Sequence, residues 1–248
     1  MTKIGFTLGV FALVVGCGQT QRATSLPSVG LTPTSKWSTT ENLSAPESVY
    51  FDAQSGQTFV SNVAGNPGEK DGNGWIATLT LDKTGKPVVT KIIKGLDAPK
   101  GLRAKHGILW IADIDTMIKV DAKTHRILAR IPIPGASFLN DPAVADDGAV
   151  YVTDTIASKI YVLQGDKSEV FAEGKDLESP NGLLLVGNRL YVASWGFITD
   201  PSTFGAKVPG HLYYLDLKTK AKTLVTNAPL GHLDSIEQAA NGDLLVSD

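Results

Sequence analysis

A unit of about 40 to 50 residues recurs along this chain, and this repeat constrains the fold more than any other feature of the sequence. Each copy begins with a polar residue in a turn, continues as one apolar run, turns near a glycine and enters a second apolar run that ends in a polar residue. The copies are APESVYFDAQSGQTFVSN, APKGLRAKHGILWIAD, FLNDPAVADDGAVYVTD, SPNGLLLVGNRLYVAS and HLDSIEQAANGDLLVSD.

The polar residues that start the five copies are separated by 53, 40, 41 and 53 positions; they are Glu47, Lys100, Asn140, Asn181 and Asp234. Third and fourth strand-like runs follow the first two, and no amphipathic helix is evident between them. Four antiparallel strands per repeat are typical of propeller blades. We therefore predict an all-β fold, a six-bladed β-propeller of four-stranded blades, with the last part of blade five and most of blade six absent from this chain.

The segment before the first copy resembles the segment before the second. KWSTTENLSAPES parallels KIIKGLDAPKG, in which an outer fourth strand leads into the next blade. By analogy, residues 36–43 are expected to form an outer strand of the last blade. The polar residues that close the second strands, Asn62, Asp113 and Asp154, are expected to tie neighbouring blades through hydrogen bonds to the backbone.

The N-terminus reads as an export signal. Lys3 precedes an apolar run from Ile4 to Val15, which is too short to span a bilayer as a helix, and the run ends in VVGC. We predict a lipoprotein signal peptide over residues 1–16, lipidation of Cys17, a flexible Ser/Thr/Pro/Gly-rich tether over 17–35 and the propeller over 36–248. The alternative is an ordinary secretory signal with an incidental cysteine. Either signal implies an exported protein, and lipidation implies anchoring in the cell envelope, on a membrane that faces the periplasm or the cell exterior.

Composition narrows the range of partners. The 248 residues are 42% hydrophobic and 19% charged, with a formal net charge of −2. Acidic and basic residues are interspersed, so the sequence presents no basic face for nucleic acid. We expect no nucleic-acid partner, and a membrane contact only through the lipid.

Four of the five starting residues offer oxygen ligands. In a propeller the loops into the innermost strands lie on one face beside the axis, so these residues should converge there. Glu47, Asn140, Asn181 and Asp234 together supply two carboxylates and two amide carbonyls, a set that suits Ca²⁺ or another divalent cation better than zinc. Asn and Asp at turns also cap the backbone through their own side chains, which is the structural alternative for each residue taken singly.

Two further elements belong to this face. Lys100 holds the second-blade position, where its ammonium could repel the metal, bind an anionic substrate or point away. The long connections Asn62–Gly74 and Ser194–Gly210 should form the walls or lid of a pocket.

Short motifs in these segments resemble those of a known family. LND at 139–141, SPNGL at 179–183 and LDS at 233–235 are similar to segments of the SMP-30, gluconolactonase and luciferin-regenerating-enzyme group of six-bladed propellers, with paraoxonases and diisopropylfluorophosphatase as more distant relatives. The resemblance covers residues 45–248. It implies that Glu47, Asn140, Asn181 and Asp234 hold or border a divalent metal that polarises a lactone or ester carbonyl or a phosphoryl oxygen. The arginine that gluconolactonase-like members carry before the third-blade asparagine is replaced by Phe138 and Leu139, so a sugar lactone is not expected.

Two functions follow as hypotheses. The first is a calcium-dependent lactone or ester hydrolase, with Asp234 and His232 as catalytic residues and Lys100 in substrate binding. His232 lies two residues before Asp234, within reach as a general base, although a surface histidine without a role is equally compatible with the sequence. The second is a noncatalytic, metal-stabilised propeller that binds a ligand or protein on the same face.

Overall fold

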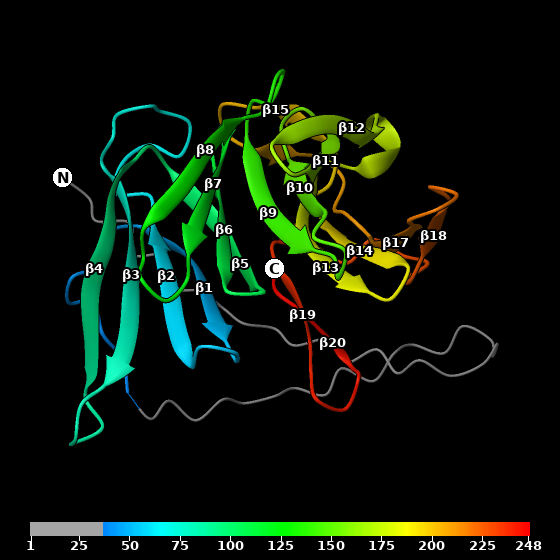
Figure 1. Ribbon diagram of the computed structural model, residues 1–248. Coiled ribbons are helices and arrows are strands. Elements are labelled where there is room, and N and C mark those ends of the chain that lie inside the picture. Colours follow the sequence, from blue (N-terminus) through cyan, green and yellow to red (C-terminus); the bar gives the residue numbers. More distant parts are fainter. Residues whose placement is uncertain (1–36) are drawn as a thin grey trace.

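Four antiparallel sheets follow one another along the chain and fan out around an axis (Figure 1). This computed structural model describes residues 37–248. The sheets are β1 (Pro46–Asp52), β2 (Gln57–Asn62), β3 (Gly74–Leu81), β4 (Pro87–Leu96); β5 (Pro99–Lys105), β6 (Ile108–Asp113), β7 (Thr116–Asp121), β8 (Ile127–Pro132); β9 (Leu139–Val144), β10 (Val150–Asp154), β11 (Lys159–Gln164), β12 (Lys167–Glu173); and β13 (Pro180–Val186), β14 (Arg189–Ser194), β17 (Leu212–Asp216), β18 (Lys222–Leu224).

Three smaller elements complete the described part. β19 (Ile236–Gln238) and β20 (Leu244–Val246) pair as the start of a fifth sheet. β15 (Ile198–Asp200) and β16 (Gly205–Ala206) form a hairpin inside the connection from β14 to β17, and a 3₁₀ turn, η1 (Lys175–Leu177), precedes β13. The chain is therefore a β-propeller of four-stranded blades, as predicted from the repeat, with four complete blades and two strands of a fifth.

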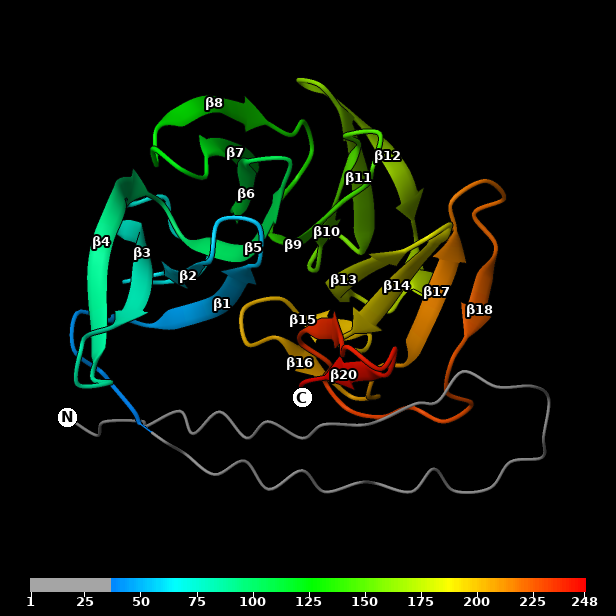
Figure 2. The same ribbon diagram turned by 60° about the horizontal axis from the view of Figure 1, so that its bottom comes forward.

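The core lies between the blades. The first strands of the blades, β1, β5, β9, β13 and β19, are neighbours around the axis (Figure 2). The four largest hydrophobic clusters each join consecutive blades, as where Phe59 and Ile76 of the first blade pack with Leu102 and Ile111 of the second. Both faces of an interior sheet are covered in this way, which explains why every residue of β10 is buried. Burying each such aliphatic or aromatic side chain contributes about 1.5–3 kcal/mol.

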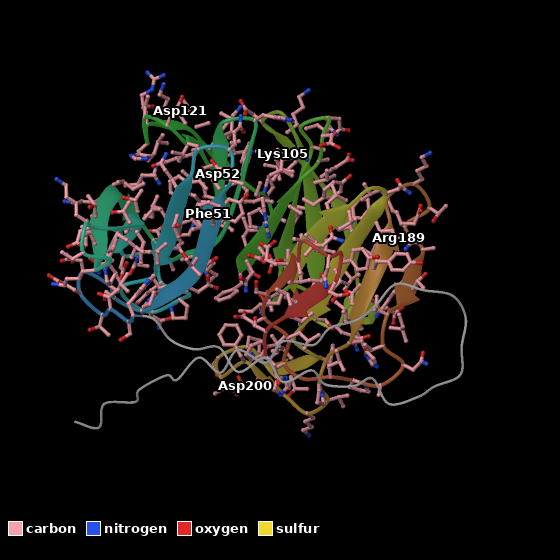
Figure 3. The ribbon with its side chains drawn as sticks, turned by 90° about the horizontal axis from the view of Figure 1, so that it is seen from below. Phe51, Asp52, Lys105, Asp121, Arg189 and Asp200 are labelled. Atoms are coloured by element: carbon pink, nitrogen blue, oxygen red, sulfur yellow. The ribbon has the colours of Figure 1, made fainter. Side chains whose placement is uncertain are left out.

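One face of the first blade has no blade before it. Two positions after the starting residue, Leu102, Leu183 and Ile236 are 2%, 0% and 1% exposed, since each packs against the preceding blade. The equivalent Val49 is 69% exposed. Phe51, further along β1, is 60% exposed (Figure 3). The ring formed by this chain is thus open beside β1.

The predicted outer strand before the first blade is not formed. Residues 37–45 contain no strand. Instead Leu43 packs against the cluster of Trp75, Ala77 and Val89 in the first blade, and Asn42 Nδ2 donates to Val89 O at 3.4 Å. The expected pairing with the last blade is absent within residues 37–248, because the fifth sheet described there has only β19 and β20 and offers no third strand to accept an outer strand. Lys36, the signal peptide, Cys17 and the tether lie outside the described residues.

Polar residues at the ends of the second strands fasten the segments that lead into the inner strands. Asp113 and Asp154 bind connections that arrive from the preceding blade, as expected, whereas Asn62 binds the segment that enters its own blade. Asn62 Oδ1 accepts from Ser44 N at 3.0 Å, Asp113 Oδ1 from Ala98 N at 2.7 Å, and Asp154 Oδ2 from Ser137 N at 2.7 Å. These bonds satisfy backbone donors that the sheets leave unpaired. They also fix the residues that enter each inner strand, where the candidate site lies.

Within residues 37–248, no helix has the length and apolar character needed to cross a membrane.

Candidate functional site

The starting residues occupy equivalent places, as the repeat predicts. Glu47, Lys100, Asn140 and Asn181 are each the second residue of the inner strand of their blade, and Asp234 lies two residues before β19. In the first four blades the pairing between the inner and second strands shifts register next to this residue. Such irregularities re-aim side chains at the end of a strand.

A cavity of about 170 Å³ lies among these strand ends. Three of the four predicted metal ligands, Glu47, Asn140 and Asp234, line it. The fourth, Asn181, is hydrogen-bonded to one of these three: its Nδ2 donates to Asp234 Oδ1 at 2.9 Å. The cavity is completed by Ser48, Val49, Asp141, Ser235 and Ser247. The structure thus places three of the four predicted ligands at one cavity and the fourth, Asn181, behind Asp234.

Hydrogen bonds donated by the NH₂ groups of Asn140 and Asn181 fix the orientation of these two side-chain amides. Asn140 Nδ2 donates to Thr155 Oγ1 at 3.2 Å, and this hydroxyl in turn donates to Pro180 O at 3.0 Å, which fixes the direction of both bonds. Asn181 donates to Asp234, and Asn181 Oδ1 is buried without any hydrogen-bond partner. A buried carbonyl left unsatisfied costs about 1–3 kcal/mol, so this oxygen is suited to a ligand that the protein itself does not supply.

Carboxylates that face one another dominate the electrostatics of the cavity. Burial raises the pKa of Asp141 to about 7 against the opposing pull of the Arg103 guanidinium. Burial also raises the pKa of Asp234, although the hydrogen bond from Asn181 counteracts it. Glu47 is exposed to solvent beside β1. The protein that surrounds its carboxylate still displaces water from it and raises its pKa, and the charges of Asp234 and Asp141 raise the pKa further. A cation in the cavity would relieve this repulsion.

Lys100 turns away from the cavity. Its side chain is 1% exposed, Nζ donates to Ala98 O at 3.0 Å, and the ammonium lies 4.0 Å from the ring centroid of Phe138. Burial lowers the pKa of Lys100 to about 8, while the Glu47 charge opposes this shift. Of the three roles that the sequence left open, the geometry matches the one in which the ammonium points away, and a role in substrate binding stays a prediction.

His232 is held in one orientation beside the fourth blade. Its Nδ1 lies 2.7 Å from Trp195 O, which identifies Nδ1 as the protonated nitrogen, and its ring stacks on the Trp195 indole at 5.2 Å between centroids. When the imidazole is neutral, the other nitrogen, Nε2, is then its acceptor, as a general base requires. His232 is not among the residues that line the cavity.

The long connection Ser194–Gly210 folds over this face of the blades. Phe204, next to the hairpin of β15 and β16, packs on Phe138 of the third blade with ring centroids 5.0 Å apart. Trp195 Nε1 donates to Phe204 O at 2.9 Å. The other long connection, Asn62–Gly74, reaches the second blade through an ion pair between Lys70 and Asp115. Neither connection contributes a residue to the lining of the cavity, so their expected role as walls or lid of the pocket stays a prediction.

An ion pair crosses the ring between inner strands. Arg103 Nη1 of β5 lies 2.5 Å from Glu237 Oε1 of β19. The guanidinium carbon of Arg103 also lies 5.0 Å from the centroid of the Tyr50 ring. The charge of Asp141 contributes to the raised pKa of Arg103, and the charge of Arg103 acts on Asp141 in return. The axial cavity and this ion pair are therefore electrostatically coupled through Asp141.

Sequence reasoning missed several of these residues. Asp141, Ser235 and Ser247 line the cavity although only their neighbours were singled out. Asp141 and Ser235 directly follow the predicted ligands Asn140 and Asp234 in the sequence, and this position next to a predicted ligand is what could have identified them. Arg103 and Glu237 could not have been paired from the sequence, because 134 positions separate them.

Within residues 37–248, no three His, Cys, Asp or Glu side chains are grouped so that they could hold a metal ion by themselves. The predicted site differs from such a group, because two of its four proposed ligands are asparagine amides.

The fold and the axial cavity define a propeller protein with a polar, carboxylate-rich centre, and solved propellers are similar to it. Virginiamycin B lyase from Staphylococcus aureus superposes with a TM-score of 0.57 at 14% identity over 80% of this chain. This chain spans 61% of the length of that lyase structure. A catalytically inactive form of the same lyase with quinupristin gives 0.54 at 12% identity, covering 84% of this chain and 79% of that one.

A nidogen/laminin complex gives a TM-score of 0.53 at 14% identity, covering 68% of this chain and 64% of that one. Identities at this level establish the propeller fold alone. No protein-family model matches the sequence, and no curated protein does either.

Proposed function

We propose that this protein is a hydrolase of lactones or esters that depends on a divalent cation, Ca²⁺ by the chemistry of its ligands, as in the SMP-30 and gluconolactonase group that its motifs resemble. The observation that carries the proposal is the buried, unpartnered Asn181 Oδ1 next to the Asp234 carboxylate. Tyr161 Oη and Thr226 Oγ1 are also buried without a partner, but of the three atoms only Asn181 Oδ1 belongs to a residue bonded to a carboxylate of the cavity, which supports a ligand there.

The donor set fits calcium. Glu47 and Asp234 would supply charge that balances a divalent ion, and the carbonyl oxygens of Asn140 and Asn181 would supply neutral ligands. The NH₂ ends of both amides are already engaged, so neither amide must rotate to offer its oxygen. Nitrogen and sulfur donors, which zinc prefers, are absent from the residues that line the cavity.

Each residue would have a distinct task in the reaction. The bound ion would act as a Lewis acid toward the carbonyl of a substrate. Asp234, held by Asn181, is oriented to attack the carbonyl carbon or to align a water molecule. His232, whose Nδ1 is held by Trp195 O, could take a proton from that water at Nε2. Phe138, which stands at the place of the sugar-handling arginine, is buried against Phe204, so this position offers no hydrogen bond to a sugar hydroxyl.

The alternative is a noncatalytic propeller that keeps a cation for stability and binds a partner. Its supporting observation is the exposed apolar pair on β1, Val49 at 69% and Phe51 at 60%. Propellers serve both purposes, so the site must decide between them. The two functions differ in whether the protein turns over any lactone or ester.

We also propose export and lipid anchoring, because the sequence around Cys17 has the form of a lipoprotein signal. This places the proposed substrates in the cell envelope or outside the cell.

The test is activity of the parent protein and of Asp234→Asn against a panel of lactones and aryl esters, with calcium added after chelation. We expect calcium-dependent turnover by the parent and at least a 100-fold lower kcat in Asp234→Asn at saturating calcium, since the variant keeps one oxygen but loses the charge. A parent inactive across the panel would favour the binding module. Activity that survives in Asp234→Asn would move the chemistry away from this residue.

A further inference from the structure

The fourth blade fastens its entry differently from its neighbours. In the second, third and fifth blades, an aspartate at the end of the second strand accepts backbone N–H groups of the incoming connection; these residues are Asp113, Asp154 and Asp248. The fourth blade has Ser194 at this place, because Ser194 pairs with Pro180 as Asp113 pairs with Pro99. The carboxylate must then come from elsewhere.

Glu178, in the connection itself, supplies that carboxylate. Its Oε2 accepts from His211 Nδ1 at 2.7 Å, from His211 N at 3.2 Å and from Ser194 Oγ at 3.4 Å. Its Oε1 accepts from Lys222 Nζ at 2.6 Å. Burial raises the pKa of Glu178, but the hydrogen bonds from Lys222 and His211 outweigh this and lower it overall. Glu178 is therefore an ionised, fully bonded anchor.

This anchor holds a strained turn. Glu178 and Ser179 have φ values of 56° and 51°, and no other two consecutive non-glycine residues of the described chain have positive φ. Such conformations persist only where the surroundings enforce them. Asn181 follows two residues later, so the turn sets the point from which this candidate ligand enters β13.

The same turn also holds the base of the long connection. Glu178 O accepts from Gly196 N and Ser179 O accepts from Trp195 N, both at 3.0 Å. Trp195 O in turn accepts the Nδ1 proton of His232. One strained turn is thus bonded to the residue that orients the candidate base and lies next to the strand that carries the candidate ligand.

We propose that Glu178 is a positioning residue that sets the placement of both Asn181 and His232 through the turn at Glu178 and Ser179. The proposal rests on the proposed function in giving these two residues a task. Partners that orient a metal ligand from behind typically change metal affinity roughly 10- to 100-fold when they are removed. Loss of the Glu178 carboxylate should therefore act on the site more than on the fold.

The experiment compares Glu178→Ala, Glu178→Gln and the control Asp216→Asn in the full chain. Asp216 is a carboxylate of the same blade that accepts from Lys218 N and Thr219 N in a hairpin, without contact to the turn. Three quantities are measured: the dissociation constant for Ca²⁺, the ¹⁵N shifts of the His232 imidazole, which report its tautomer, and the thermal midpoint.

For Glu178→Ala we expect calcium affinity to fall at least ten-fold and the His232 signal to change from one tautomer to a mixture. Its thermal midpoint should fall below that of Asp216→Asn, because an anchor is lost, but the protein should still melt cooperatively and be folded at the temperature of the binding and NMR measurements. Glu178→Gln, which keeps one acceptor oxygen, should recover part of both effects. The proposal is overturned if Glu178→Ala leaves the His232 tautomer unchanged, or if the control alters the site equally. A parent that binds no calcium would refute the proposed function, whereas the tautomer would still decide the role of Glu178.

Discussion

Asn181 Nδ2 donates to Asp234 Oδ1 at 2.9 Å and so links the inner strand of the fourth blade to the entry of the fifth beside the axial cavity. The bond uses the donor end of the amide and leaves its oxygen buried without a partner. An ordinary structural role would satisfy both ends of a buried amide. This arrangement is what we propose for a ligand side chain whose oxygen is completed by a bound cation.

Replacing Asn181 by Leu should separate the site from the fold. The variant loses one hydrogen bond but also removes an unsatisfied oxygen, so without calcium its free energy of unfolding should stay within about 1 kcal/mol of the parent value. The stabilisation produced by calcium should disappear. Thermal melts with chelator and with calcium measure both, and Asn188→Leu, which alters an exposed asparagine of the same blade, is the control that should keep the calcium effect. A calcium effect that persists in Asn181→Leu would remove this residue from the site.

The raised pKa of Asp141 predicts an unusual dependence of stability on pH. The folded-state pKa is about 7, and that of an unfolded aspartate is about 3.9. Between these values the folded protein binds more protons than the unfolded chain, so this group makes the free energy of unfolding fall as pH rises from about 4 to about 7. The raised pKa values of Glu47 and Asp234 act in the same direction.

Urea unfolding with chelator at pH 5 and pH 7.5 measures this fall, and Asp141→Asn should show a smaller one. His125, whose pKa burial lowers, works in the opposite direction near pH 6, which is why the comparison with the variant is needed. An equal fall in both proteins would assign the effect to other groups.

Asp154 should be a major determinant of blade stability. Its fully buried carboxylate accepts from Ser137 N, Phe138 N and Ala157 N. Asp154→Ala leaves these donors unpaired and should cost about 3 kcal/mol. Asp147→Ala, which removes a single bond to Ala149 N in the same blade, should cost less than about 1 kcal/mol. Denaturant unfolding of both variants gives the two values, and equal losses would contradict the anchoring role.

Anchoring in a membrane can be tested at Cys17. Lipidation requires its thiol, so Cys17→Ser should move the protein from the membrane fraction to the soluble fraction of the cell envelope. A variant that still sediments with membranes would show that something other than a lipid at Cys17 retains the protein.

The sequence was most informative about features that repeat. The period of the starting residues predicted the blades. In the first four blades the starting residue is indeed the second residue of the inner strand; these residues are Glu47, Lys100, Asn140 and Asn181. That the side chains of Asn62, Asp113 and Asp154 accept hydrogen bonds from backbone N–H groups was predictable for the same reason. Features that break the repeat were not predictable. The fourth blade has Ser194 where other blades have a strand-end aspartate, and nothing in the sequence indicates that the carboxylate there comes from Glu178, in the connection before β13.

Long-range and side-chain geometry also lay beyond the sequence. The direction of Lys100 depends on Phe138, a residue of another blade, and the pairing of Arg103 with Glu237 depends on how the inner strands of distant blades approach one another around the axis. The expected outer strand at residues 36–43 failed because local similarity to residues 91–101 carries no information on whether a partner strand is available.

The central claim is that Glu47, Asn140, Asn181 and Asp234 bind calcium at the axial cavity, and calorimetric titration of the chelated protein tests it directly. We predict one Ca²⁺ ion bound per chain, affinity that increases from pH 5 to pH 7.5 as the carboxylates ionise, and at least ten-fold weaker binding by Asp234→Asn. Absence of binding at millimolar calcium, or equal binding by parent and variant, would contradict the account.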